Sequence, residues 1–206
     1  MKLLTAAATA ISLLAATPAM AGSAFLVDFE KIWGFGEPVD NTYASSGVSF
    51  TNVLGLSNGD GLGSLPNGDY YANAPTPLGT AFAQLDGATN TTAFMNVAGG
   101  VDNHLSLYYS TPSSVLGAIT AWSGLNGTGT LLGTLDLAAT DPAYSVWTPV
   151  TFSFNGTALS FDLTGTANLV AIDNVAAVPE PESYALLLAG LGLLGFVARR
   201  KKQQTA

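Results

Sequence analysis

The chain has 206 residues, of which 48% are hydrophobic and 10% are charged, so it is long enough for one domain with its own core. Its net charge is −8, with one histidine and no cysteine, which excludes disulfide staples and thiolate metal sites. Residues 22–177 hold twelve acidic residues and one basic residue, Lys31, so this region carries −11. Because nucleic-acid binding needs a basic surface, we expect no nucleic-acid partner. The acidity favours solubility and contact with divalent cations.

The first 21 residues have the pattern of a secretory signal peptide. A lysine at the second position precedes an apolar stretch over residues 6–16. Ala19 and Ala21 form an A-x-A cleavage pattern, which predicts Gly22 as the mature N-terminus. We therefore expect residues 1–21 to form a signal helix that is removed on export.

The middle region, residues 22–177, shows the period-two hydrophobic alternation of half-buried strands. Strands are predicted over residues 25–30, 47–53, 92–97, 104–110, 115–122, 131–137, 150–154, 159–163 and 169–175. Asn155 and Gly156 predict a type I′ hairpin turn between two of them, and residues 54–77 predict a long loop. No sustained helical face is present, so we predict an all-β domain, a β-sandwich of jelly-roll type.

Calcium is the best candidate for a bound ion. Asp28 and Glu30 alternate along the first predicted strand, and Asp173 lies on the last one. The first and last strands of jelly rolls are commonly neighbours, so these oxygens can converge, and Ca²⁺ prefers oxygen ligands. The placement resembles the structural calcium site of carbohydrate-binding jelly rolls; solvated surface carboxylates are the alternative. The loop at 58–61 is a second candidate that lacks the closing glutamate of an EF-hand.

Catalytic residues are not indicated. His104 is the one histidine, and a Ser–His–Asp arrangement would need a distant serine beside it. The chain has no Gly-x-Ser-x-Gly elbow and no phosphate-binding loop. We therefore predict that the protein is not an enzyme.

Five aromatic residues are candidates for a flat sugar-binding platform. Trp33 is the most suggestive because a loop after the first strand would expose it. Tyr70 and Tyr71 lie in the predicted long loop, whereas Trp122 and Trp147 lie in strand-like runs that favour packing. Packing in the core is the alternative for all five.

The C-terminal segment combines an extended motif, an apolar run and a basic end. Proline at 179 and 181 favours extended backbone over 178–182. The uncharged run 185–198 spans about 21 Å, shorter than a hydrocarbon core of about 30 Å. An interfacial tyrosine at 184 and the basic end compensate, so we predict a transmembrane helix over 184–198. The predicted membrane stop is Arg199, Arg200, Lys201 and Lys202.

This segment resembles the PEP-CTERM sorting signal of Gram-negative bacteria. The resemblance rests on Val178, Pro179, Glu180 and Pro181, followed in order by the hydrophobic segment and the basic cluster. It implies recognition and cleavage by an exosortase near the Pro-Glu-Pro motif. It also implies a transient stay in the inner membrane and transfer to the cell surface or exopolysaccharide matrix. We therefore assign residues 178–206 to sorting.

The sequence predicts a structural or adhesive protein of the cell surface or extracellular matrix, without catalytic activity. The alternative is a carbohydrate-binding module for exopolysaccharide on the same scaffold, with a structural calcium ion. No other cofactor is expected.

Overall fold

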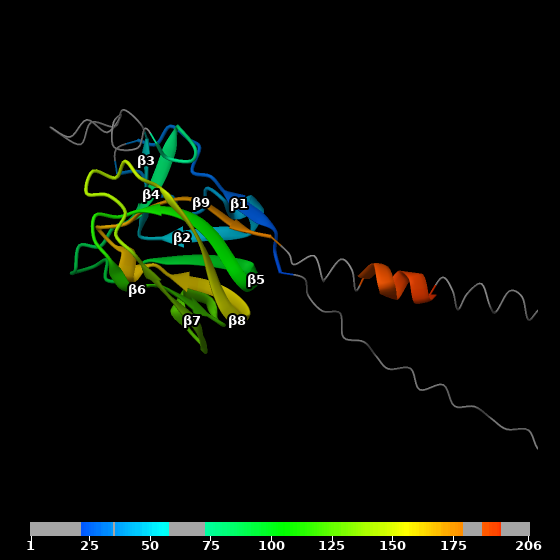
Figure 1. Cartoon of the computed structure of the whole chain (residues 1–206). Helices are drawn as coiled ribbons and strands as arrows, with labels where there is room; N and C mark the ends of the chain where they lie inside the picture. The colour runs from blue at the N-terminus through cyan, green and yellow to red at the C-terminus, as the bar shows by residue number, and fades with distance from the viewer. Residues whose placement is uncertain (1–21, 35, 58–72, 179–186, 195–206) are drawn as a thin grey trace, which may run out of the picture.

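The computed structural model describes residues 22–34, 36–57, 73–178 and 187–194. This part of the chain is mostly β-sheet, with a short helix over 187–194 (Figure 1). Its strands are β1 (Phe25–Val27), β2 (Val48–Thr51), β3 (Val53–Ser57), β4 (Gly79–Ala83), β5 (Phe94–Ser110), β6 (Val115–Trp122), β7 (Leu131–Leu137), β8 (Thr148–Asp162) and β9 (Ala171–Ala177). Three short 3₁₀ turns are η1 (Ala44–Ser46), η2 (Leu125–Gly127) and η3 (Thr164–Thr166).

The strands form one hydrogen-bonded sheet in the order β3-β4-β9-β5-β8-β6-β7, with β1 added to β9 and β2 added to β5. The long strands β5 and β8 pair with each other at both ends, and their register shifts twice. One shift lies between Asn96 and Val101 and the other between Asp102 and His104. Such bulges bend a strand, which allows the two ends of the sheet to cover one core.

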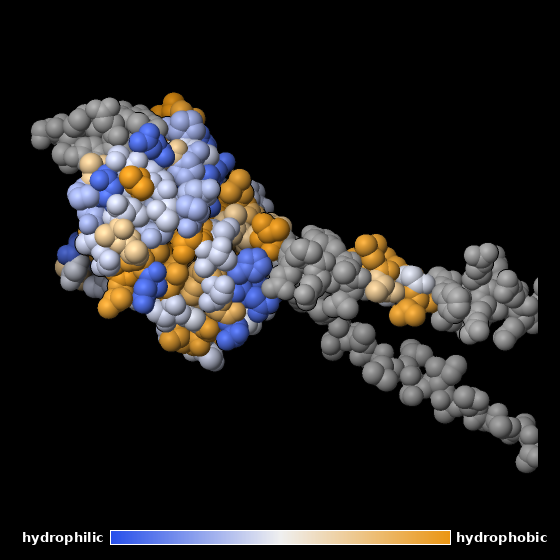
Figure 2. Space-filling model, in the orientation of Figure 1, coloured by the Kyte–Doolittle hydropathy of each residue, from blue (hydrophilic) through white to orange (hydrophobic). Residues whose placement is uncertain are grey.

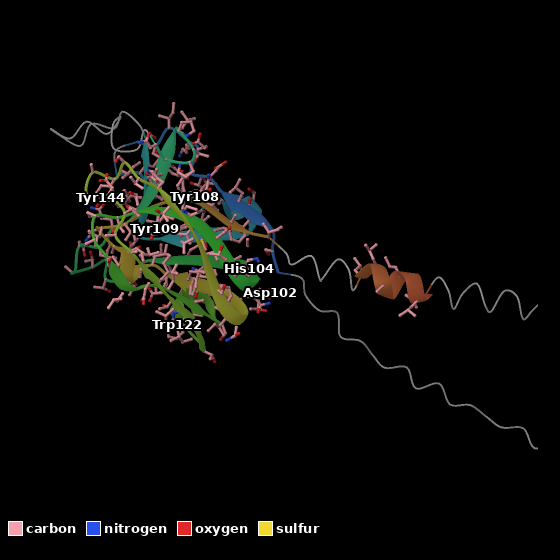
Figure 3. The ribbon with its side chains drawn as sticks, viewed as in Figure 1. Asp102, His104, Tyr108, Tyr109, Trp122 and Tyr144 are labelled. Carbon is pink, nitrogen blue, oxygen red and sulfur yellow. The ribbon has the colours of Figure 1, made fainter. Side chains whose placement is uncertain are left out.

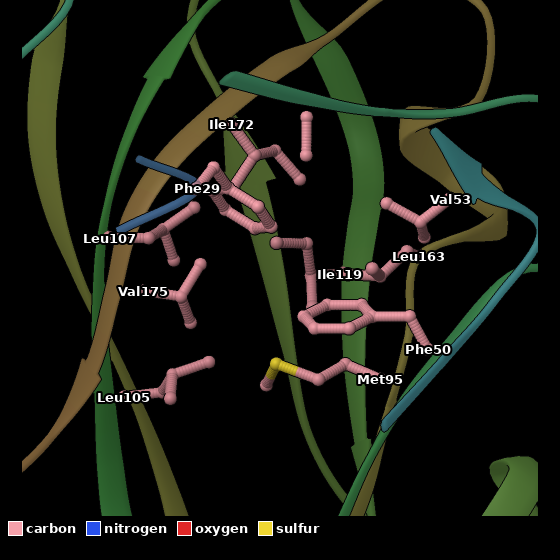
Figure 4. A pocket seen from close by; sticks show the side chains of 11 residues that line it. Phe29, Phe50, Val53, Met95, Leu105, Leu107, Ile119, Leu163, Ile172 and Val175 are labelled. Atoms are coloured by element: carbon pink, nitrogen blue, oxygen red, sulfur yellow. The ribbon is translucent and has the colours of Figure 1, made fainter. Parts of the chain in front are cut away.

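The core lies between the two layers of the folded sheet. Phe50 of β2 and Ile119 of β6 face Ile172 and Val175 of β9 across a cavity of about 20 Å³ (Figure 4). All the residues that line the cavity are apolar, so it stays free of water. This packing confirms the predicted β-sandwich, while the jelly-roll connectivity stays a prediction.

Alternation of side chains positions the strands as the sequence predicts. In β8, Phe152 and Phe154 are buried, whereas the alternate residues Thr151 and Ser153 are exposed. Strands β6 and β7 begin and end at the predicted residues. Strand β4, at residues 79–83, lies outside every predicted strand, because its small side chains give no alternation.

The predicted hairpin at Asn155 and Gly156 is wrong. Both residues lie inside β8, and the two halves of β8 pair with the same partner, β5. Gly156 has a φ of 96°, and its N–H donates to Asn103 Oδ1 at 3.2 Å. The Asn-Gly pair therefore supplies the left-handed backbone of a bulge and not that of a chain reversal.

The first and last strands pair with each other. Phe25 lies opposite Ala177, and Val27 lies opposite Val175, in antiparallel register. Because β1 begins where β9 ends, the start of the described chain and the end of β9 lie at the same end of the domain (Figure 1).

The helix over 187–194 lies within the predicted membrane segment. Its large side chains are exposed and are coloured as hydrophobic in Figure 2. Within the described ranges, no helix is both long enough and apolar enough to cross a membrane. The remainder of the predicted span, residues 184–186 and 195–198, lies outside the described residues, as do the predicted signal helix and the basic stop.

The predicted exposure of Trp33 is wrong. Only 1% of its surface is exposed, and its Nε1–H donates to the carbonyl of Phe29 at 2.9 Å. The indole ring packs against the backbone of Gly55 and Gly79, where an added Cβ would lie 2.0 Å and 2.9 Å from ring atoms. Trp33 therefore holds the segment after β1 against β3 and β4, and it offers no platform to a sugar.

We predict that Gly55→Ala destabilises the domain. The new methyl group would overlap the Trp33 ring, and overpacking of this kind costs about 3 kcal/mol. Denaturant unfolding measures the loss of unfolding free energy. In the control Gly34→Ala, the Cβ would meet Glu37 Oε2 at an ordinary 3.4 Å, so stability should stay nearly unchanged. Equal stability of Gly55→Ala and the parent would contradict the assigned position of Trp33.

Candidate functional site

A cluster of acidic side chains lies beside the paired strands β1 and β9. Their pairing confirms the expectation that the first and last strands are neighbours. The expectation that Asp28 and Glu30 alternate along one strand is wrong. Strand β1 ends at Val27, and Phe29, which separates the two acids, has a φ of 53°. Asp173 lies on β9 and is fully buried.

Thr76 lies at the centre of the cluster. Its N–H donates to Asp173 Oδ2 at 3.1 Å, and its Oγ1 lies 2.9 Å from the same oxygen. The same hydroxyl lies 3.0 Å from the carbonyl oxygen of Asp28. Asn174 N–H donates to Asp173 Oδ1 at 2.7 Å. The buried Asp173 carboxylate is thus satisfied by neutral donors from the loop before β4 and from its own strand.

The other two carboxylates also accept hydrogen bonds. Glu30 Oε1 accepts from the N–H groups of Leu78 at 2.8 Å and Gly79 at 3.2 Å. Asp28 Oδ1 accepts from the Tyr43 hydroxyl at 3.3 Å. The cluster therefore fastens three loops together beside β9.

Burial and negative charge in the cluster raise the pKa of two of its groups, Asp173 and Tyr43. Burial is the main cause that raises the pKa of Asp173 to about 6, and the charge of Glu30 adds to the rise. Hydrogen bonds from Thr76 and from the backbone oppose it. Burial and the nearby charge of Asp28 hold the pKa of Tyr43 well above its usual range. A cation would relieve this excess of negative charge.

The predicted calcium ligands lie near one another, but they are not arranged as a preformed metal site. In the part of the chain that the structure describes, no group of three or more His, Cys, Asp or Glu side chains could hold a metal ion. The carboxylates of Asp28, Glu30 and Asp173 accept protein hydrogen bonds instead. A calcium ion would have to take the place of Thr76 at Asp173. The second candidate loop, 58–61, lies outside the described residues.

His104 is half-buried on β5, opposite Ser153 of β8. Asp102 lies two residues earlier on the same strand (Figure 3). Its carboxylate accepts from the backbone N–H of Gly22 at 2.9 Å and from the hydroxyl of Thr157 at 2.5 Å. Asp102 is therefore a structural acceptor that joins the N-terminal segment to β5 and β8.

Trp122 and Trp147, the two other tryptophan candidates, pack against the sheet. Trp122 is half-buried, and its Nε1–H donates to Thr120 Oγ1 at 2.8 Å. Trp147 packs with Phe82 and Tyr144 in a second, smaller apolar cluster. These positions agree with the predicted packing role of both tryptophans. Tyr70 and Tyr71 lie outside the described residues.

A polar groove of about 390 Å³ is the second candidate site. It is lined by Gly36, Pro38, Asp40, Asn52, Leu54, Gln84, Asp86 and Asn90. Asn52 donates to the carbonyl of Thr92, and Asp86 accepts three N–H groups of its own turn. Asp40 and Gln84 are exposed, and no described hydrogen bond engages their side chains. Sequence reasoning missed this groove because its residues come from three separate segments.

The junction between the domain and the C-terminal segment is accessible. Strand β9 ends at Ala177, and the next residue, Val178, is 66% exposed. The motif residues Pro179, Glu180 and Pro181 lie outside the described residues. The same holds for Ala19 and Ala21 of the predicted cleavage site, and for the membrane stop Arg199, Arg200, Lys201 and Lys202.

Residues 177–202 match the PEP-CTERM protein-sorting motif, so the chain carries this motif directly after β9. The predicted resemblance is thereby confirmed. The motif is the target of exosortase processing, and it indicates export and a surface or extracellular destination. No curated protein matches the chain.

Several solved structures are distantly similar to this chain. A cleaved adhesin domain of Lys-gingipain is 13% identical with a TM-score of 0.45, over 75% of this chain and 99% of that chain. CBM35 from Paenibacillus barcinonensis is 14% identical with a TM-score of 0.40, over 76% and 99%. The CBM22-1 xylan-binding domain from the same organism is 10% identical with a TM-score of 0.42, over 76% and 94%.

We predict a pH-dependent contribution of Asp173 to stability. Its pKa is about 6 in the folded protein and 3.8 in a model compound, so the folded state favours the neutral carboxyl. The contribution is therefore complete below about pH 4 and is lost as the pH rises through about 6. Unfolding free energies measured in EDTA should show this trend in the parent relative to Asp173→Asn. A difference between the two that stays constant from pH 4 to 7 would contradict the assignment.

Proposed function

We propose that this protein is an exported structural or adhesive component of the cell surface or extracellular matrix. The observation that carries the proposal is the sorting motif at residues 177–202, which continues directly from a core strand. A motif fused to β9 delivers the folded domain itself, because the match begins at Ala177, the last residue of the strand.

The domain geometry supports this route. Because Phe25 of β1 pairs with Ala177 of β9, the predicted signal peptide and the sorting motif both join the domain at one end. A precursor held in the inner membrane by both segments therefore needs no rearrangement of the sandwich. Removal of the signal peptide at Gly22 and exosortase processing near Pro179 then act at the same end of the domain.

We further propose that the domain has no catalytic activity. Two of its acidic residues act as acceptors for local backbone N–H groups: Asp86 for residues 88–90, and Asp141 for Ala143 and Ser145. The hydroxyls of Thr89 and Ser145, together with these backbone hydrogen bonds, hold the pKa of both carboxyls below its usual range, which suits turn formation and not proton transfer at neutral pH.

We predict that Glu180→Gln blocks processing of the exported protein. Mass spectrometry of surface-associated parent protein should give a C-terminus between Val178 and Glu182, whereas the variant should retain its full tail. Glu182→Gln removes the same charge two residues later, outside the Pro-Glu-Pro motif, and is the matched control. Recovery of intact Ala206 on surface-associated parent protein would overturn the proposal.

A carbohydrate-binding module is the second candidate function. The polar groove favours it, because exposed amide and carboxylate groups of Gln84 and Asp40 can bond sugar hydroxyls. None of the described residues that line the groove is aromatic, so binding to them would depend on hydrogen bonds. Trp33 takes no part because it is buried.

We predict that the double variant Asp40→Ala and Gln84→Ala weakens binding to host exopolysaccharide at least about tenfold, the effect of about 1.4 kcal/mol. Thr151→Ala, an exposed change on β8, is the control. Equal retention of the parent and the double variant in a polysaccharide pull-down would exclude the groove. Absence of binding by the parent would favour the structural role.

Calcium binding at Asp28, Glu30 and Asp173 is proposed as a structural aid to either function. A bound ion stabilises only the folded state, so EDTA should lower the melting temperature by several degrees. In Asp28→Asn, EDTA should leave the melting temperature unchanged. Added magnesium should not restore the melting temperature that the parent loses in EDTA. Identical melting curves with calcium and with EDTA would end the proposal.

A further inference from the structure

The backbone nitrogen of Gly22 lies 2.9 Å from the carboxylate oxygen Oδ2 of Asp102. Directly after it, the N–H of Ser23 donates to the carbonyl of Gly100, also at 2.9 Å. Gly22 is half-buried, so the segment that precedes β1 is seated on β5 and does not project freely from it. Asp102 lies at the middle of β5, beside its register shifts, on the side of the domain from which this segment starts (Figures 1 and 3).

The contact between residues 22–23 and β5, called the seat below, has room only for glycine at two positions. A Cβ added at Gly22 would lie 3.0 Å from both the backbone nitrogen and Oδ2 of Asp102. A Cβ added at Gly99 would lie 2.0 Å from Ser23 Oγ. Glycine at both positions therefore allows the nitrogen of Gly22 to reach the carboxylate.

The carboxylate is held in place from its other side. Asp102 Oδ1 accepts from the hydroxyl of Thr157 at 2.5 Å, and the two residues are paired across β5 and β8. Oδ2 is therefore directed at Gly22 by a contact that does not involve the N-terminal segment.

We propose that removal of the signal peptide creates an ion pair between the α-ammonium of Gly22 and Asp102, which locks the mature N-terminus to β5. Hydrolysis of the Ala21–Gly22 bond consumes one water, breaks the C–N bond and forms a C–O bond at the Ala21 carbonyl. Ala21 leaves as a carboxylate, and the nitrogen of Gly22 becomes a cationic ammonium. That nitrogen already lies within bonding distance of Oδ2, so a hydrogen bond from a neutral amide to the carboxylate becomes an ion pair without any movement of the chain.

The excess of acidic residues in the domain strengthens this ion pair between Gly22 and Asp102. Lys31 is the one basic side chain between residues 22 and 178, and it already pairs with Glu37. The new ammonium is thus a second cation in a strongly acidic domain, placed against a carboxylate. Because β1 pairs with β9, fixing the start of the chain also secures the strand that carries the sorting motif. The inference rests on export of the protein and on cleavage at Gly22.

The test compares chains that begin at Gly22 with chains that retain Ala21, both ending at Ala206 and kept in detergent. The retained residue moves the ammonium about 3.8 Å along the chain but leaves the amide of Gly22 in place. The chain that begins at Gly22 should melt about 2 °C higher, a difference that 0.5 M salt reduces. In Asp102→Asn the difference should vanish, whereas Asp136→Asn, which removes the same charge elsewhere, should preserve it.

Acylation of the α-amine, followed by mass spectrometry of the N-terminal peptide, gives a second readout. Asp102→Asn should increase the rate of acylation several-fold while the rate at Lys31 stays constant. The inference is overturned if Asp102→Asn leaves both the melting difference and the acylation rate unchanged. These chains are made without export, so their behaviour tests the ion pair alone. N-terminal sequencing of the naturally exported protein tests the cleavage site, and a terminus other than Gly22 would also refute the inference.

Discussion

Antiparallel pairing of β1 with β9 is the constraint that sets where both ends of the domain lie. It buries Phe25 and Val27 of the three-residue strand β1 against β9, and it joins the first strand of the domain to the last. A strand of three residues supplies little stability by itself, so its position depends on the surrounding core and on the seat at Asp102. The same pairing brings Gly22, the predicted mature N-terminus, and the sorting motif to one end.

The negative charge of the domain has a structural explanation in its turns. Asp86, Asp141 and Asp136 each accept backbone N–H groups of nearby turns or strands, and the acidic cluster beside β9 joins three loops. Few cations are needed because neutral donors satisfy these carboxylates. Asp173 is different, since it is fully buried and its pKa is raised above its usual range.

Period-two alternation and the C-terminal motif were predictable from the sequence because each is a local pattern. Strands β6 and β7 and the sorting motif follow directly from such patterns. The bulge at Gly156 was not predictable from the sequence. An Asn-Gly pair supplies left-handed backbone to a hairpin and to a bulge alike, and the pairing with β5 decides between them. Trp33 was misjudged because the glycines that accommodate its ring lie on β3 and at the start of β4, far along the chain.

In the candidate site, too, some residues were predictable from the sequence and others were not. Asp28, Glu30 and Asp173 were found because the first and last strands of a sandwich are commonly neighbours. Thr76 and Tyr43, which occupy two of these carboxylates, come from loops and carry no sequence signal of their role. The groove residues Asp40 and Gln84 were missed for the same reason.

A designed disulfide across β1 and β9 tests this account most directly. Leu26 and Ala176 are register partners, and the chain has no cysteine that could compete. Partners in an antiparallel pair have Cα atoms about 4.5–5.5 Å apart, within the range of a disulfide. The double variant Leu26→Cys and Ala176→Cys should therefore oxidise fully and melt at a higher temperature than its reduced form. A pair that stays reduced in air, or that lowers the melting temperature when oxidised, would show that the first and last strands are not neighbours.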